Sequence, residues 1–477
     1  MDDTYFNIKT IKSLFFFLAF GSMIYAQGNY RKEHYGNRSI LLNGNVTGSV
    51  DDLGLVFYNP SRLALIKNPA FSIGKAFKFS SVKLKNAFID GQNISQSSFN
   101  AIPNIVAGTF HFHFLPKDKF AYAFISRTNN DVNFGYDTGV LEGMSTGIPD
   151  SKRFLGRIDL QDRIKDEWLG LSWARKINNR FAIGISSFLS IYEMSGLGST
   201  LYTSQNTNDE VTTYNSKLKY KQKAYGLFLK LGASYKSPHL EVGLNIHLPY
   251  IDLNTFSSAS FTGEEFLTGA GVTTLFNFIN LSDTENKRKT PLGIAFGFGL
   301  PIKKNKLHFN VEWYDAVNRY KRITLPNVVS SNNTGDSLDF NEQLKSVFNF
   351  GIGSEIYISP LVKGYVSFSS DFSAYIESAN LFDVINQNND EINYESDYWH
   401  FSIGVNSKLK WGDFLIGTSY SKTSSSFVQP VNFPIQNTNN QIASDSRLDI
   451  STWRFVVGLE IPFLKEKMSK IKDLIEN

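Results

Sequence analysis

The chain has 477 residues, a formal net charge of +4 and no cysteine. The missing cysteine excludes disulfides, thiolate catalysis and cysteine-ligated metals, and the small charge without a basic stripe excludes a typical nucleic-acid surface. Aromatic residues make up 14% of the chain, with 41 Phe and 22 Tyr, yet the mean hydropathy is only −0.20. This composition is typical of a membrane β-barrel, in which apolar and polar residues alternate, and equally of a large soluble β-protein.

The N-terminus predicts export. Lys9 and Lys12 precede the apolar run SLFFFLAFGSMIYA at 13–26, which is too short for a membrane anchor and ends in small residues. We interpret residues 1–26 as a signal peptide that is cleaved after Ala26.

A short apolar segment, DDLGLVFYNPSRLAL at 51–65, comes before the first predicted strand. Asp51 and Asp52 precede its apolar residues, where a carboxylate favours the dipole of a helix. Asn59-Pro60 would end that helix, because the residue before a proline avoids the helical conformation. The pattern predicts one short helix ahead of the strands.

Beyond residue 69 the chain alternates apolar and polar residues, which is the pattern of strands with two different faces. Short turns alternate strictly with connections of roughly 20 to 37 residues. Outer-membrane barrels place short turns at the periplasmic side and long loops outside, and an even strand number puts both termini at the short turns. The predicted strands lie near 69–80, 104–115, 120–132, 167–177, 181–195, 221–237, 240–253, 291–302, 306–318, 347–359, 362–375, 398–410, 414–426 and 451–462.

The spacing of aromatic residues supports a membrane span. Tyr225 and Tyr235 lie ten residues apart on one predicted strand face. At a rise of ~3.3 Å per residue and a tilt of ~40°, this separation corresponds to about 25 Å across the membrane, the height of the apolar band between two aromatic girdles. The predicted fold class is all-β, a transmembrane antiparallel β-barrel of about 14 strands.

The predicted inward face of the barrel carries a few polar side chains, namely His111, His113, Lys230, His308, Glu312 and Arg454. His111 and His113 form a His-x-His pair that can chelate a metal, but no third ligand is specified, so we predict no metal site and no cofactor. Glycines 293, 297 and 299 leave space near one wall, either for something inside the lumen or for coiling of the strands. No nucleophile–base–acid set stands out, and a hydrolase would need a Ser/His pair in register on adjacent strands. We therefore predict that the protein is not an enzyme.

One predicted extracellular loop, at 261–281, is unusually apolar. It packs either on neighbouring loops or on an apolar ligand or partner. The ligand-binding candidates are Phe261, Phe266, Leu267, Leu275, Phe276 and Phe278. The loops at 196–220, 376–397 and 427–450 are polar and are expected to be solvated, and the tail at 463–477 has the spacing of an amphipathic helix at the periplasmic rim.

The segment at 45–65 resembles the N-terminal signature of the FadL-like outer-membrane transport family, with Ser61-Arg62 where that family has Ala-Gly. The hairpins at 226–250 and 290–315 are similar to hairpins of the same family. The matched signature positions are Gly48, Asp51 or Asp52, Phe57, Tyr58, Asn59, Pro60, Leu63 and Ala64.

The resemblance implies a plug, or hatch, at 27–68 inside a fourteen-stranded barrel at 69–462. It implies passive uptake of hydrophobic small molecules, such as fatty acids or hydrocarbons, across a Gram-negative outer membrane. The alternative is a PorV-like barrel that does not transport and instead binds a secreted or surface protein; a polar porin is a third reading. The expected partners are outer-membrane lipid and the hydrophobic molecule, with no nucleic acid. The hatch residues that it implies are Asp51, Asp52, Phe57, Tyr58, Asn59, Pro60 and Arg62.

Overall fold

The protein is seen here as a computed structural model. It describes residues 29–66, 71–86, 93–142, 151–270, 272–324, 340–375, 396–410, 412–428 and 445–461. The predicted signal peptide and the predicted tail lie outside the described residues, as do most of the predicted loops at 376–397 and 427–450.

Strands dominate the described part of the chain. Its helical segments are α2 (Arg38–Leu41), α3 (Leu55–Tyr58) and the 3-10 helices η1 (Pro60–Ala64) and η2 (Asn254–Phe256). None of the helices in these ranges is long and apolar enough to cross a membrane. The strands are β1 (Phe71–Lys85), β2 (Ile94–Phe110), β3 (Asp118–Glu142), β4 (Ser151–Lys176), β5 (Phe181–Asn206), β6 (Val211–Lys236), β7 (Glu241–His247), β8 (Ile251–Asp252), β9 (Ser258–Thr268), β10 (Leu275–Thr284), β11 (Gly293–Ile302), β12 (Asn305–Tyr314), β13 (Val317–Ile323), β14 (Phe340–Leu344), β15 (Val347–Tyr357), β16 (Val362–Asp371), β17 (Tyr398–Leu409), β18 (Gly412–Val428) and β19 (Asp445–Ile461).

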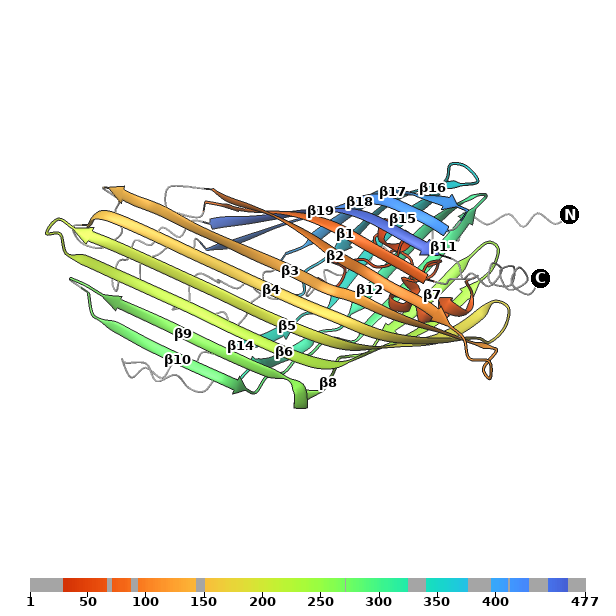
Figure 1. Ribbon diagram of the computed structural model, residues 1–477, viewed down its shortest axis with the longest axis horizontal. Helices are drawn as coiled ribbons and strands as arrows, with labels where there is room; N and C mark the ends of the chain where they lie inside the picture. Colours follow the sequence, from red (N-terminus) through yellow and green to blue (C-terminus); the bar gives the residue numbers. More distant parts are fainter. Residues whose placement is uncertain are drawn as a thin grey trace, which may run out of the picture.

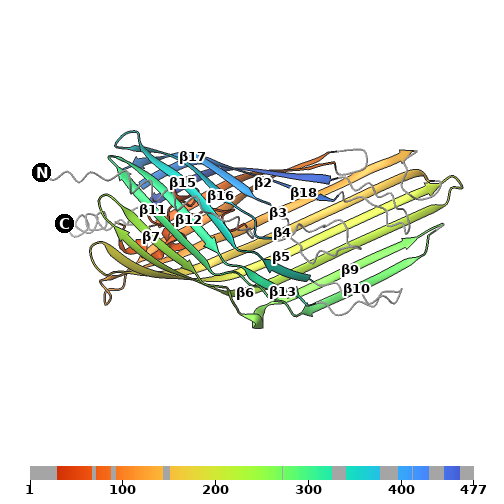
Figure 2. The same cartoon turned by 180° about the vertical axis from the view of Figure 1, so that it is seen from behind.

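The strands close into one antiparallel barrel of fourteen barrel strands, which confirms the predicted fold class. Closure comes from β1, which pairs with β19 on one side and with β2 on the other. Phe71 at the start of β1 lies opposite Ile461 at the end of β19, so the first and last barrel strands meet at one rim. Figure 1 and Figure 2 show the wall from its two sides.

Four consecutive barrel strands are interrupted. The seventh consists of β7, β8 and β9, the eighth of β10 and β11, the ninth of β12 and β13, and the tenth of β14 and β15. Between the main ladders, the backbone of 285–287 bonds to that of 322–324. The breaks at 248–250, 285–292, 315–316 and 345–346 leave the wall less regular on this side.

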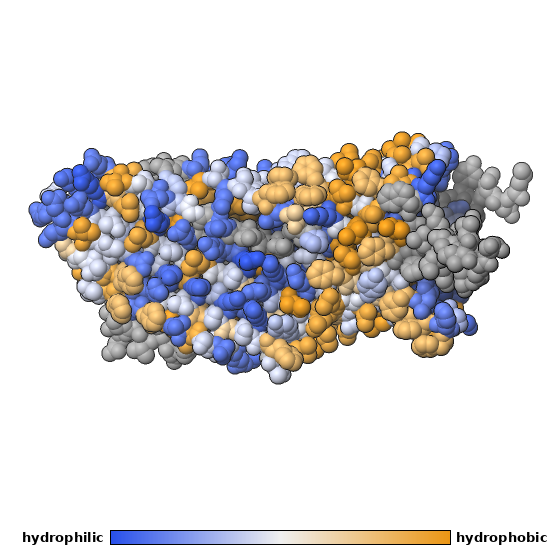
Figure 3. Space-filling model, in the orientation of Figure 1, coloured by the Kyte–Doolittle hydropathy of each residue, from blue (hydrophilic) through white to orange (hydrophobic). Residues whose placement is uncertain are grey.

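The outer face of the barrel has an apolar belt. On β6 the outward side chains from Tyr235 to Tyr225 are apolar or aromatic, and those from Lys223 to Lys217 are all lysines. The outward face of β5 from Phe181 to Ile191 lies beside this part of β6, because Phe181 pairs with Tyr235 and Ile191 pairs with Tyr225. Figure 3 shows hydrophobic residues gathered toward the right-hand end of the barrel and hydrophilic ones toward the left. The belt agrees with the height predicted from the spacing of the tyrosines.

Several strands are much longer than the sequence predicts. β3, β4, β5 and β6 have 25 or 26 residues each and run far beyond the apolar belt (Figure 1). The predicted loop at 196–220 is therefore wrong, because β5 continues to Asn206 and β6 begins at Val211. Its polar residues alternate across a strand pair whose outer face is wet, and this hides the period-2 pattern of hydrophobicity.

The predicted loop at 261–281 is also wrong in its structure, because it forms the β9–β10 hairpin. β9 pairs with β6 over 213–223, which extends the wall outward. Phe261 and Leu267 point inward and are buried, whereas Phe276 and Phe278 are 66% and 59% exposed on the other face. Phe266 and Leu275 are half-buried.

Candidate functional site: the plug and the lumen cavity

Residues 29–66 lie inside the barrel, at the end where the short turns lie (Figure 1). α2 packs against β16, β17 and β18, while η1 packs against β4, β5 and β6. The plug has its own apolar residues buried against the wall, and they form a single core with it. This core includes Leu41, Leu53, Leu55 and Leu63 of the plug and Ile105, Ala121 and Trp168 of the wall. Throughout this article, residues 29–66 are called the plug.

Glycines in the wall make room for the plug. A Cβ atom on Gly243 would lie 2.2 Å from the Thr47 carbonyl oxygen, and one on Gly297 would lie 2.8 Å from the Gly48 nitrogen. A Cβ atom on Gly299 would lie 2.5 Å from that of Ser49. For Gly297 and Gly299 the structure therefore favours a filled lumen over coiling of the strands, because the plug touches the wall where their side chains are absent. A Cβ atom on Gly293 would instead meet Tyr314 and His247 of the wall.

The Asn59-Pro60 pair ends α3, as the sequence predicts. Asn59 is extended, with φ −165° and ψ 98°, and η1 begins at Pro60. The Asn59 side chain accepts hydrogen bonds from the Ser61 backbone and hydroxyl at 3.2 and 2.6 Å, and donates to the Thr47 carbonyl at 2.8 Å. Asn245 on β7 donates to the carbonyl of Tyr58 at 2.5 Å. These bonds fix the turn of the plug and tie it to the wall.

The plug carboxylates have different roles. Asp52 is buried and accepts bonds from the Ser39 backbone and hydroxyl at 2.7 and 2.8 Å and from the Gly54 backbone at 2.9 Å. It therefore joins α2 to the turn before α3. Asp51 lies at the rim and takes part in an ion cluster.

The ion cluster is centred on Arg62, whose side chain is fully buried. Its Nη2 atom donates to Asp51 at 2.9 Å and to Glu241 of β7 at 2.8 Å, and its Nε atom donates to the Val50 carbonyl at 3.0 Å. Lys306 of β12 lies 3.0 Å from Asp51 and 3.4 Å from Glu241. Burial alone would raise the pKa of Asp51, but Lys306 and Arg62 outweigh it and hold that pKa well below its usual range. The cluster joins the plug to two strands of the wall.

A second polar group lies where the plug meets β16–β19. His400 and Ser421 pair in register across β17 and β18, with 2.6 Å between Nδ1 and Oγ. Asp371 Oδ2 is 3.8 Å from His400 Nε2. Arg454 donates to the Ser421 hydroxyl at 2.9 Å. This Ser/His pair has the register that a hydrolase would require, but all of these side chains are at most 4% exposed under the plug. The group acts as a buried contact between the plug and the wall.

A cavity of about 260 Å³ lies in the lumen next to the plug. Phe57 and Tyr30 of the plug contribute to its wall, and so do inward residues of β3 to β7. The breaks in the four interrupted barrel strands, and the strand ends beside them, supply further lining, which includes Leu248, Arg288, Tyr314 and Leu344. Because Lys230 of this lining lies midway along the Tyr225–Tyr235 span, the cavity lies at the depth of the apolar belt.

Aromatic rings form much of the cavity wall. Trp168 stacks on Phe228 with 4.3 Å between ring centroids, and Tyr30 stacks on Tyr314 at 4.0 Å. Phe228 is an apolar residue on the inward face of β6, where it points into this stack, while the outward face of the strand keeps its apolar pattern. The wall can therefore hold a flat apolar body by stacking and edge contacts.

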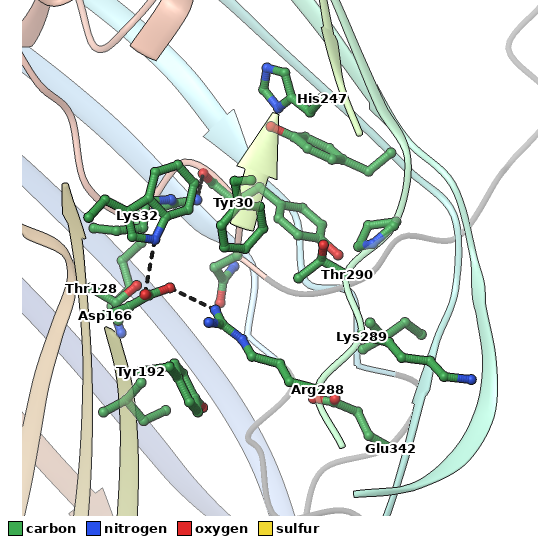
Figure 4. Close-up of a pocket in the computed structure, with 18 of the residues that line it drawn as sticks. Tyr30, Lys32, Thr128, Asp166, Tyr192, His247, Arg288, Lys289, Thr290 and Glu342 are labelled. Atoms are coloured by element: carbon green, nitrogen blue, oxygen red, sulfur yellow. Dashed lines mark hydrogen bonds and ion pairs between the residues drawn. The ribbon is translucent and has the colours of Figure 1, made fainter. Parts of the chain in front are cut away.

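Charged residues also face the cavity, and two of its acids are paired. Asp166 accepts from Arg288 at 2.7 Å and from the Trp168 ring nitrogen at 2.9 Å. Figure 4 shows these two bonds as dashed lines. Glu342 accepts from Arg322 at 2.7 Å. These pairs hold the strand breaks together at the level of the cavity.

Two further cations, Arg127 and Lys230, bind neutral oxygen atoms. Arg127 Nη2 donates to the Tyr30 carbonyl at 2.7 Å, and Lys230 Nζ donates to the Phe57 carbonyl at 2.9 Å. In the described part of the chain, neither has a carboxylate within ion-pair distance.

Four of the six polar residues predicted to face the lumen do face it. Lys230 lines the cavity, His308 bonds to Ser49 of the plug at 2.7 Å, and Glu312 bonds to the Tyr314 hydroxyl at 2.9 Å. Arg454 lies 3.1 Å from Glu33 of the plug.

The prediction for His111 and His113 is wrong. β2 ends at Phe110, so both histidines lie in the turn before β3, and both are exposed. Among the described residues, no group of three or more His, Asp or Glu side chains could hold a metal ion.

None of the six ligand-binding candidates in the β9–β10 hairpin lines the cavity. The cavity residues that sequence reasoning missed include Arg127, Trp168 and Arg288. The sequence marks these residues only weakly. Trp168 and Arg127 lie at inward positions of strands that continue into long polar stretches, where the alternation of apolar and polar residues is lost. Arg288 lies in a strand break, where no period exists.

These features define a class of protein: a lipid-facing barrel with a folded plug and a cavity in its lumen. The comparison with solved structures agrees. A FadL homologue of Pseudomonas aeruginosa matches with a TM-score of 0.55 at 11% identity, covering 91% of this chain and 100% of that one. The toluene transporter TodX of Pseudomonas putida matches with a TM-score of 0.56 at 10% identity, covering 92% and 100%. The monoaromatic hydrocarbon channel CymD matches with a TM-score of 0.50 at 10% identity, covering 90% and 98%.

These likenesses show that the chain has the FadL-like fold, as the resemblance in the sequence implies. No model of a protein family matches the chain, and neither does any curated protein.

Proposed function

We propose that the protein is an outer-membrane channel for the passive uptake of hydrophobic small molecules. The observation that carries this proposal is the aromatic cavity inside a lipid-facing barrel, next to a plug that fills the lumen. Pockets for small molecules combine apolar and aromatic walls with a few polar groups, and this cavity has that composition. The similar structures include a toluene transporter and a monoaromatic hydrocarbon channel, which supports this proposal.

The route begins at the long extracellular end of the barrel. There the inward side chains of the long strands form a second apolar cluster, which includes Tyr202, Tyr214, Leu218 and Phe261. We assign the β9–β10 hairpin to the first contact with the ligand, because Phe276 and Phe278 are exposed beside this cluster. The ligand then reaches the cavity and leaves past the plug.

Uptake is tested in cells with an intact lipopolysaccharide outer membrane, because toluene crosses an ordinary phospholipid bilayer unaided. Radiolabelled toluene at low concentration is the probe, and cells without the barrel give the background. Thr128→Trp places a ring in the cavity and is expected to abolish uptake, since Thr128 lines it. Thr203→Trp, on the outer face of β5, is the matched control and is expected to behave as the wild type. Uptake no faster than background in the wild type would refute the channel and favour the binding scaffold.

The plug is proposed to move during uptake. A disulfide tests this directly, because the chain has no other cysteine. A Cβ atom on Gly458 would lie 3.5 Å from that of Asn37, within the range of disulfide bonds. The Asn37 side chain makes no hydrogen bond within the described structure, so Asn37→Cys/Gly458→Cys removes none. Oxidation should stop uptake and reduction should restore it. Equal uptake in both redox states would refute plug movement without refuting the channel.

We propose that residues 1–26 are the export signal. We also propose that the rim of the barrel with Phe71 and Ile461 faces the periplasm. Both chain ends then lie in the periplasm. Protease added to intact cells should leave the ends uncut, and the N-terminus of the mature protein should be Gln27.

A further inference from the structure

The cavity carries more positive than negative charge. Six basic residues line it, and only three acidic ones. Two of the acids, Asp166 and Glu342, already bind Arg288 and Arg322. Figure 4 shows the Asp166–Arg288 contact at one side of the cavity and Lys289 pointing away from it.

Arg127 and Lys230 converge on the same two rings. The Lys230 ammonium lies 3.3 Å from the centroid of Phe57, and the Arg127 guanidinium lies 5.5 Å from it. Both also lie within about 6 Å of the Trp168 ring, at 5.9 and 6.0 Å. Lys230 is 3% exposed and Arg127 is half-buried. Two cations are thus held side by side at one aromatic wall.

Such an arrangement is unfavourable when it is empty. Burial of a charge is costly unless the charge is paired, and an aromatic face compensates only part of that cost. Arg127 cannot lose its proton, so it stays charged whatever Lys230 does. Among the described residues, the acceptors of both groups are neutral carbonyl and hydroxyl oxygens. An anion would pair both charges.

We propose that this cavity binds an aromatic anion, with Arg127 and Lys230 holding its carboxylate and the Phe57 and Trp168 rings holding its body. The proposal rests on the proposed channel function and specifies its cargo. A guanidinium and an ammonium at one point match the charge and the oxygens of a carboxylate. A neutral hydrocarbon would leave both cations unpaired.

The size of the cavity limits the ligand. About 260 Å³ is at the small end of the range for ligand pockets. The walls are rings that can stack, namely Tyr30, Phe57, Trp168, Phe228 and Tyr314. A single-ring carboxylate fits this shape better than an extended acyl chain, because its flat faces meet flat faces.

The test is equilibrium binding to the purified full-length barrel in a nonionic detergent, with benzoate, toluene and octanoate as probes. Benzoate should bind at least tenfold more tightly than toluene, which lacks the charge, and than octanoate, which lacks the ring. Lys230→Met and Arg127→Met should each weaken benzoate binding at least tenfold and leave toluene unchanged. Lys230→Arg should restore most of the benzoate affinity. Lys219→Met, on the exposed outer face of β6 and outside the cavity lining, is the matched control and should have no effect.

Equal binding of benzoate and toluene, or unchanged benzoate binding in both methionine variants, would overturn the anion site. Octanoate binding equal to that of benzoate would overturn the aromatic part. A shift of the barrel in heat-modifiable gel migration checks that each variant is folded. Uptake of toluene by cells reports on the channel separately, so a failed channel and a failed anion site give different results.

Discussion

Replacement of Arg62 by methionine should release the plug. Methionine keeps much of the volume but removes the bonds to Asp51 at 2.9 Å and to Glu241 at 2.8 Å. Removing one partner of a buried ion pair costs about 3–5 kcal/mol. Lys306 and Lys236 stay within 3.5 Å of Glu241, so we take the lower end of the range. A loss of about 3 kcal/mol corresponds to a roughly 150-fold rise in the population of released plug.

The assay is hydrogen exchange of the peptide amides at 50–65, measured by mass spectrometry on the barrel in detergent. Exchange in Arg62→Met should be roughly 150-fold faster there and unchanged in the wall strands. Arg157→Met is the matched control: Arg157 pairs with Asp137 at 2.6 Å but is 55% exposed, so no change is expected. In a double-mutant cycle with Glu241→Gln, the two effects should be less than additive. A change below threefold in the plug, or an equal change in the whole barrel, would refute the reasoning.

Three further predictions follow from the contacts of the plug. Burial, and then His400 and the nearby arginines, lower the pKa of His34, so a seated plug favours the neutral ring; the stability of the plug is therefore full above about pH 6.5 and falls as the pH drops below it. After correction for the pH dependence of intrinsic amide exchange, the protection of the plug amides should fall between pH 6.5 and 5 in the wild type and fall less in His34→Phe, because His308 and His400 also contact the plug; an equal fall in both proteins would contradict this. Gly297→Val should displace the plug, since its Cβ atom would lie 2.8 Å from the Gly48 nitrogen, and plug exchange should approach that of an unfolded segment in a barrel that still resists SDS at room temperature. Replacement of both His111 and His113 by alanine should change neither uptake nor zinc content, because both side chains lie in an exposed turn; a loss of uptake would show that this turn has a function.

The sequence predicts the barrel well because its strands have one lipid-facing side. The spacing from Tyr225 to Tyr235 reports the belt height directly, since every second residue there must be apolar. Where strands continue beyond the membrane, both of their faces can be polar, so the sequence shows no alternation of apolar and polar residues that would predict a strand. That is why β5 and β6 look like a loop at 196–220.

The candidate site was only partly predictable. The Asn59-Pro60 pair predicts the end of α3 correctly, because the residue before a proline avoids the helical conformation. Arg288 lies between two strands, where its position in the sequence does not predict whether its side chain points into the lumen or outward. The wall partner of Arg62, Glu241, lies 179 residues away along the chain, and no local pattern encodes this pairing.

The departure of Arg62 from the family signature has a structural explanation. An arginine in place of a small residue would be a buried unpaired charge if the wall stayed the same. Here Glu241 of β7 meets it at 2.8 Å, and Lys306 balances the two carboxylates. The cluster carries charges of both signs close together, so its net field is small.

The breaks in the wall and the charges of the cavity are parts of one arrangement. A regular strand turns every second side chain outward and keeps its backbone groups in the ladder, so the side chains at a break are the ones that can leave this alternation. Pro249 and Pro291 have no N–H to donate, and β7 ends before the first while β11 begins after the second. Side chains at these breaks can point into the lumen. Arg288 does so, and its charge is paired there because it donates to Asp166. The cavity therefore exists where the ladder is interrupted, and its charge is set by residues at the breaks and by Arg127 and Lys230 on the intact strands.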